Sequence, residues 1–110
     1  MSALVTLLAA LTLTSGLQGV VTRGPTRPVC SASEPCTAPA ARTGLIFIFG
    51  VRRWTTTTDA RGRYRIALPP GTYRVLLARP PAIGGIRPTR VLVPAGRFST
   101  RNFTYDTGIR

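Results

Sequence analysis

The sequence predicts an all-β fold, a single antiparallel β-sandwich built from seven short strands. First, 11 Gly and 10 Pro among 110 residues interrupt the chain too often for a helix of three turns. Second, polar and apolar residues alternate in several short segments, as they do in half-buried strands. Third, turn-forming residues separate these segments at fairly regular spacing. A sandwich is the economical way to bury one face of each such strand.

The first 18 residues have the order of a secretory signal. An uncharged apolar run over residues 3–13 is followed by Thr14, Ser15 and Gly16, although no Lys or Arg precedes the run. The run is too short to span a bilayer comfortably. We therefore expect a signal peptide at residues 1–18, a sandwich domain at residues 19–110 and a secreted, extracellular protein. The alternative is an uncleaved membrane anchor over residues 3–21.

The first predicted strand covers residues 19–22, and a Pro-rich segment with two cysteines follows it. Cys30 and Cys36 are separated by five residues, and a secreted protein would be expected to join them in a disulfide. Closing such a short loop stabilises a fold by about 2 kcal/mol. Two thiols without a His ligand do not complete a tetrahedral metal site. We expect neither a metal nor another cofactor.

The next two strands have different exposure patterns. Residues 44–49 are an unbroken apolar run, GLIFIF, which predicts a strand buried on much of both faces. Residues 53–58 contain Trp54 and a run of threonines, which suits a half-exposed strand. Trp54 is interpreted as core or edge packing, and the alternative is a platform for stacking a sugar.

The stretch TTDARGRYRIALPPGTYRV, residues 57–75, predicts a turn followed by two strands. Asp59 and Gly62 occupy the first and fourth positions of a type I turn. Alternation then places one set of side chains inward: Tyr64, Ile66, Leu68, Tyr73, Val75 and Leu77. We expect a hairpin with Leu68 opposite Tyr73 and Ile66 opposite Val75, because a one-residue slip would push Arg65 into the core.

The rest of the chain predicts a loop and two more strands. Residues 79–88 are rich in Pro and Gly and are interpreted as a long mobile loop. Its centre, Ile83, Gly84, Gly85 and Ile86, is the candidate contact loop, because ligand contacts concentrate on the loops of rigid scaffolds. Residues 89–93 and 98–105 predict the last two strands.

Three segments of this sequence resemble the carboxypeptidase regulatory-like domains, which belong to the transthyretin-like β-sandwiches. They are GVVT at residues 19–22, DARGRY at residues 59–64 and LPPGTYRV at residues 68–75. The closing DTGIR also resembles the end of small secreted bacterial members. The resemblance covers roughly residues 19–110 and implies a prealbumin-like Greek-key fold and a non-catalytic module. Some related adhesin repeats form a Lys–Asn isopeptide bond, which a chain without Lys cannot form.

Composition excludes most catalytic chemistry. All 15 basic residues are Arg, and the chain contains no Lys and no His. Triads that use His and zinc sites that use His are therefore excluded. A glycosidase pair would have to come from Glu34, Asp59 and Asp106, each of which lies in a turn, a loop or past a strand. We predict that the protein is not an enzyme.

Two function hypotheses remain. The first is a monomeric, non-catalytic module that contacts a protein or a cell-envelope polymer. The second is a polyanion-binding protein, because a net charge of +12 attracts nucleic acid, acidic polysaccharide or phosphate-rich polymer. Arg63, Arg65 and Arg74 are the candidate anion contacts on one sheet face. Solvated edge charges that deter strand addition, or a coding bias toward Arg, would explain the same pattern.

Overall fold

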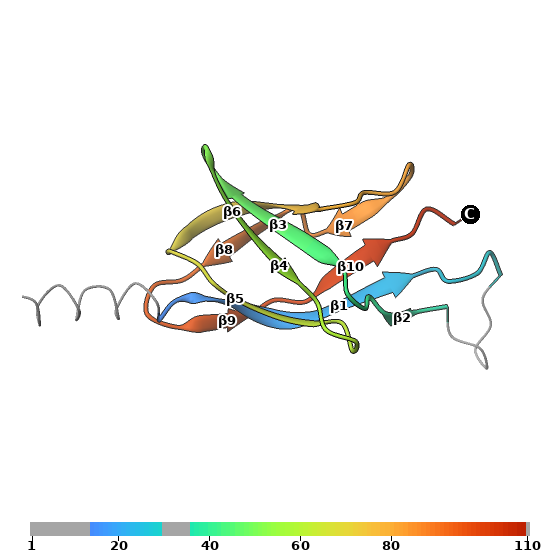
Figure 1. The fold of residues 1–110 in the computed structure, drawn as a ribbon, viewed down its shortest axis with the longest axis horizontal. Helices are drawn as coiled ribbons and strands as arrows, with labels where there is room; N and C mark the ends of the chain where they lie inside the picture. Colours follow the sequence, from blue (N-terminus) through green and yellow to red (C-terminus); the bar gives the residue numbers. More distant parts are fainter. Residues whose placement is uncertain (1–13, 30–35, 110) are drawn as a thin grey trace, which may run out of the picture.

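The computed structural model describes residues 14–29 and 36–109 and shows two β-sheets that lie face to face (Figure 1). The described residues contain ten strands and no helix. In the same residues, no helix is long and apolar enough to cross a membrane. The predicted all-β class is confirmed, while the extra strands include very short ones such as β2 (Ala38–Pro39).

The first sheet is organised around β1 (Gly16–Gly24), a long strand with neighbours on both sides. The first half of β1 lies between β5 (Arg63–Ala67) and β9 (Phe98–Thr100). Its second half lies between β2 and β10 (Phe103–Asp106), and β10 also pairs with β7 (Gly85–Arg87). Because β1 runs parallel to β9 and β10, the sheet is mixed, which corrects the purely antiparallel expectation.

The second sheet is antiparallel throughout and has the order β4-β3-β6-β8. Its strands are β4 (Arg52–Thr57), β3 (Gly44–Phe49), β6 (Gly71–Leu77) and β8 (Arg90–Val93). The inward positions in the middle of β3, β6 and β8 are apolar or aromatic and buried, whereas alternate positions are half-buried or exposed; Phe49, at the end of β3, is also exposed. This sheet therefore has one dry face and one outer face.

The predicted hairpin between residues 63–68 and 73–77 is wrong. Strand β5 pairs with β1 in the first sheet, whereas β6 pairs with β3 and β8 in the second. Leu68 and Tyr73 are both buried, at 1% exposure, as their alternation predicted. Alternation determines which side chains face the core and does not choose the partner strand. Pro69 and Pro70 instead carry the chain from one sheet to the other.

Aromatic rings join the two sheets. The ring centroid of Phe47 on β3 lies 6.3 Å from those of Tyr64 on β5 and Phe103 on β10. The Tyr64 hydroxyl donates a hydrogen bond of 2.6 Å to the Arg101 carbonyl, and burial raises the pKa of this phenol above its ordinary value.

Within the second sheet, Trp54 on β4 packs edge-on against Tyr73 on β6, with 5.4 Å between the ring centroids. This contact confirms the packing interpretation of Trp54.

The segment interpreted as a mobile loop contains strand β7. Ile86 is 6% exposed and pairs with Tyr105, while Gly85 pairs with Asp106. Of the four residues of the candidate contact loop, Ile83 alone is a strongly exposed apolar side chain, at 59%. A three-residue edge strand flanked by Pro and Gly is too short to show an alternation signal, so the sequence pattern concealed it.

The folded unit begins before residue 19. The Leu17 side chain is completely buried, and the Ser15 hydroxyl donates a 2.6 Å hydrogen bond to the Leu68 carbonyl. Residues 15–18 therefore contribute to the sandwich, and cleavage after Gln18 would remove them from it. Residues 1–13, which carry the apolar run, lie outside the described residues.

Replacing Leu17 by Ala should destabilise the protein by about 2–5 kcal/mol, because a fully buried Leu loses its contacts and leaves a cavity. The matched control is Leu92→Ala on β8, where the side chain is 56% exposed and the cost should stay within about 0.5 kcal/mol. Urea unfolding of both variants measures the difference. Equal effects would show that β1 is not anchored through Leu17.

The turn from Asp59 to Gly62 provides a second test. The Gly62 N–H donates to the Asp59 carbonyl at 3.1 Å, which confirms a reversal at these residues. Gly62 has a φ of +77°, and a Cβ there would lie 2.5 Å from the Val21 carbonyl oxygen. Gly96 has nearly the same φ, +76°, with nothing within 4 Å of such a Cβ.

Gly96→Ala should cost about 1–2 kcal/mol from backbone strain alone, and Gly62→Ala should cost clearly more because β1 must also move. The free energy of unfolding in urea distinguishes the two variants. An equal loss would mean that the approach of Val21 to Gly62 is not a constraint.

Candidate functional site

The three arginines predicted as anion contacts do not share one face. Arg63 and Arg65 lie on β5 in the first sheet, whereas Arg74 lies on β6 in the second. The predicted cluster depended on the hairpin pairing of β5 with β6 and is corrected together with it. Each arginine has a separate environment.

Arg63 stabilises the Asp59 turn. Its Nε lies 3.2 Å from a carboxylate oxygen of Asp59, and the backbone N–H groups of Arg61 and Arg63 donate to the other oxygen at 2.8 and 2.9 Å. The hydrogen bond from the Arg63 backbone is the main cause that lowers the pKa of Asp59 below its ordinary 3.8. Arg63 is therefore engaged within the fold.

Arg65 covers the outer face of β1. Its guanidinium donates to the side-chain oxygen of Gln18 and lies 3.8 Å above the centroid of the Phe98 ring. The second contact is a cation–π interaction, which shields an aromatic side chain next to strand β1. Arg65, like Arg63, has partners inside the protein.

Arg74 belongs to a row of charges that crosses the second sheet. It pairs with Arg90 on β8 and with Ile48 on β3, and Ile48 in turn pairs with Arg53 on β4. Paired residues share a face, and their neighbours Tyr73 and Val75 are buried, so these arginines point outward. We call Arg53, Arg74 and Arg90 the arginine row. All three residues are exposed.

The strands of the second sheet supply no carboxylate that could neutralise the arginine row. Strands β3, β4, β6 and β8 contain no Asp or Glu. Like charges directly opposite each other, such as Arg74 and Arg90, destabilise a sheet. The same outer face carries four apolar side chains between and beside the charges. Ile46, Ile48 and Leu76 are half-buried and Leu92 is exposed, and we call these four residues the apolar patch.

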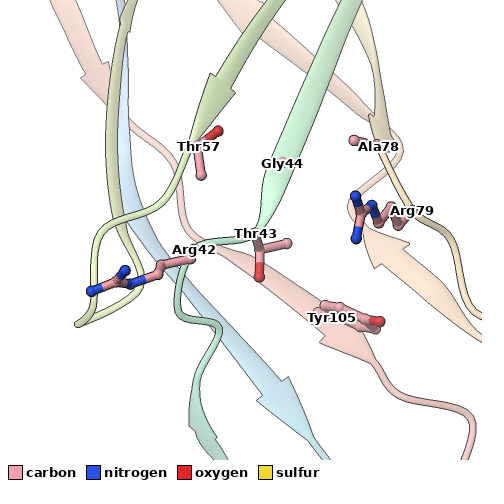
Figure 2. Close-up of a pocket in the computed structure, with 7 residues that line it drawn as sticks. All are labelled: Arg42, Thr43, Gly44, Thr57, Ala78, Arg79 and Tyr105. Carbon is pink, nitrogen blue, oxygen red and sulfur yellow. The ribbon is translucent and has the colours of Figure 1, made fainter.

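One end of the sandwich is hollowed into an open pocket of about 460 Å³ (Figure 2). It lies where β3 begins and where β4 and β6 end, and β10 contributes Tyr105. We call it the end pocket. Its lining is Arg42, Thr43, Gly44, Thr57, Ala78, Arg79 and Tyr105.

Backbone hydrogen bonds hold the elements that form the end pocket. The Ala78 N–H donates to the Gly44 carbonyl and the Thr58 N–H donates to the Thr43 carbonyl, each at 2.9 Å. The buried Thr58 hydroxyl also accepts a 2.8 Å hydrogen bond from the Thr43 N–H. Arg42 has a φ of +51°, in the left-handed region that side-chain-bearing residues seldom adopt. The rim of the pocket is thus a defined turn.

A second, smaller pocket of about 240 Å³ adjoins the candidate contact loop. Gly84, Gly85 and Ile86 line it together with residues of β6, Pro80 and Thr89, whereas Ile83 is not part of the lining. The lining is almost entirely apolar or backbone. Whether a partner binds this loop stays a prediction.

The other predicted site is the disulfide. Cys36 is 8% exposed, and its Sγ lies 3.6 Å from the Val29 carbonyl oxygen. Cys30 lies outside the described residues, so the bridge between the two stays a prediction. Within residues 14–29 and 36–109, no group of three His, Cys, Asp or Glu side chains could hold a metal.

Comparison with known proteins adds no family to these observations. No protein-family model matches the chain, and no curated protein matches it either. The similarity to carboxypeptidase regulatory-like domains therefore stays a hypothesis based on the motifs themselves.

Sequence reasoning missed the arginine row and the end pocket for the same reason. Arg53 and Arg90 stand at outward positions of their strands, which alternation can reveal, but only the strand order places them in one row with Arg74. The end pocket combines Thr43, Arg79 and Tyr105 from three distant parts of the sequence. No local pattern connects such residues.

The lowered pKa of Asp59 predicts a dependence of stability on pH. A carboxylate whose pKa is lower in the folded state stabilises the fold above its unfolded pKa, and this contribution is lost as the pH falls through the folded pKa. Asp59→Asn should therefore be less stable than the original protein near neutral pH, and the difference should shrink between about pH 5 and pH 2.

Urea unfolding of both proteins across this pH range measures the difference. A constant gap between them would show that the substituted amide fails to replace the turn geometry and that the charge of Asp59 does not matter.

Proposed function

We propose that the protein is a secreted, non-catalytic β-sandwich module that binds an acidic polymer through the arginine row. The observation that carries this proposal is the alignment of Arg53, Arg74 and Arg90 across a sheet whose strands contain no carboxylate. A polymer that carries phosphates or carboxylates would supply the missing counter-charges. Polymers of the cell envelope, acidic polysaccharides and nucleic acids share this chemistry.

The spacing of the arginine row suits an extended polymer. Neighbouring strands lie about 4.8 Å apart, so Arg74 and Arg90 are adjacent while Arg53 stands two strands from Arg74. The row thus spans about 15 Å across the sheet. Each guanidinium can form a two-pronged hydrogen bond with a carboxylate or phosphate, which a strongly hydrated ammonium does less well.

The apolar patch also supports polymer binding by this face. Leu92 is 56% exposed, although it lies directly beside the row. A bound chain would cover Leu92 and Ile48 and would leave the charged groups in contact with its anions. Apolar burial then adds affinity that salt does not screen, while the charges accelerate association.

The arginine row fits this role better than the candidate contact loop does. Ile86 belongs to the core and Gly85 pairs with β10, so these two residues have structural roles. Ile83 alone would offer a large exposed apolar contact on that loop. One exposed apolar side chain is a small contact for a protein partner. Three aligned arginines are a larger contact for an acidic polymer, so we favour the arginine row.

The remaining parts of the proposal come from composition and pattern. A chain without His or Lys lacks the usual groups that transfer protons near neutral pH. Asp59, one of its three acids, is held in a turn by Arg61 and Arg63. The apolar run of residues 3–13 supports secretion. The motifs at residues 59–64 and 68–75 support membership among the carboxypeptidase regulatory-like domains.

Arg74→Gln should weaken binding to heparin, used as a model polyanion. Losing one anion contact should reduce the slope of log affinity against log salt by about 1. Arg97→Gln is the matched control, because Arg97 is also an exposed arginine, lies outside the row, and its loss lowers the net charge by the same amount. Salt-gradient elution and titration at several salt concentrations measure both variants.

Equal losses of heparin affinity for Arg74→Gln and Arg97→Gln would show that binding depends on net charge alone. That result would refute the arginine row as the binding face. Absence of retention by the unmodified protein at about 150 mM salt would overturn polyanion binding itself. Thermal unfolding of both variants verifies that each is folded.

A further inference from the structure

We propose that the end pocket binds a single acidic sugar unit, a hexuronate or a hexose phosphate. The pocket is separate from the arginine row. Gly44 at its wall and Ile48, which lies between Arg53 and Arg74, are four residues apart on β3, which corresponds to about 13 Å along a strand. The inference therefore adds a second binding site and does not depend on the polymer-binding face.

The charge of the end pocket selects an anion. Arg42 and Arg79 line it, and none of its lining residues is acidic. Within residues 14–29 and 36–109, neither guanidinium forms an ion pair, and the nearby Asp59 is engaged by Arg63. The Arg79 guanidinium is turned toward Thr43 and Tyr105, whereas that of Arg42 extends away from them at the rim (Figure 2). Arg79 is therefore the principal anion contact.

The other lining groups match a polyhydroxylated ring. Thr43, Thr57 and Tyr105 each carry a hydroxyl. The Thr43 hydroxyl donates to the Ala41 carbonyl at 3.2 Å and can accept from a sugar hydroxyl, whereas those of Thr57 and Tyr105 can donate or accept. Tyr105 also contributes an aromatic surface, half-buried against the core, on which the apolar face of a sugar can pack. A bare inorganic anion would use the guanidinium and leave this ring unused.

The size and rigidity of the end pocket suit a ligand of this kind. A volume of about 460 Å³ falls within the range of small-molecule sites. Its wall is held in place, because the Ala78 N–H donates to the Gly44 carbonyl at 2.9 Å and joins the end of β6 to the start of β3. The site is therefore formed before a ligand arrives, which reduces the entropy lost on binding.

The test is calorimetric or NMR titration of the full chain with galacturonate, glucose 6-phosphate, galactose and inorganic phosphate. We expect at least one acidic sugar to bind at least tenfold more tightly than galactose and inorganic phosphate. Arg79→Gln should weaken that binding tenfold or more, and Arg97→Gln should leave it unchanged. Arg79→Lys, which keeps the charge without the planar fork, should fall between the two.

Three results would overturn the inference. They are equal binding of inorganic phosphate and the acidic sugars, unchanged sugar binding by Arg79→Gln, and no measurable binding of either acidic sugar. Chemical-shift changes centred on Thr43, Thr57 and Tyr105 would support the assigned location, and changes confined to other strands would contradict it.

The outcome is distinguishable from failure of the proposed function. Arg74→Gln should lower retention on heparin without affecting binding of the single sugar. Arg79→Gln should weaken binding of the single sugar and should lower heparin retention no more than the control Arg97→Gln does. Sugar binding without heparin retention would refute polymer binding and support the end pocket. Heparin retention without sugar binding would refute the end pocket alone.

Discussion

The dual pairing of β1 is the constraint on which the rest of the structure depends. This one strand provides backbone partners to β5, β9, β2 and β10, and its Leu17 and Val21 are completely buried. Residues 16–18 pair with β5 on one side and with β9 on the other. Without them, β5 and β9 would both lose their backbone partner in the sheet. The start of β1 is therefore part of the core architecture, although its sequence adjoins an apolar leader-like run.

The two sheets use their arginines in different ways. In the first sheet, Arg63 is paired with Asp59 and Arg65 covers Phe98, so both stabilise local structure. In the second sheet, Arg74 and Arg90 stand opposite each other without a carboxylate on the same strands. A protein that tolerates this repulsion retains a surface that an anion can neutralise. This contrast separates charges that are paired within the fold from charges without a carboxylate on their own sheet, which a net charge of +12 alone does not reveal.

Local patterns in the sequence predicted some features well. The alternation of Tyr64, Tyr73 and Val75 identified core positions, and Asp59 with Gly62 identified a turn, because both features depend on neighbouring residues only. The pairing of β5 with β6 was wrong, since many antiparallel pairings bury the same faces. The short strand β7 escaped detection because three residues between Pro and Gly carry too little pattern.

The sequence by itself determined the all-β class, the inward face of its longer strands and the exclusion of His-dependent chemistry, because composition and alternation act over a few residues. Only the tertiary structure decided which strands are neighbours. That choice removed Arg63 and Arg65 from the candidate anion surface and placed Arg53 and Arg90 in one row with Arg74. It also brought Thr43, Arg79 and Tyr105 around one pocket. Strand order is set by how all apolar faces pack at once, so no single segment encodes it.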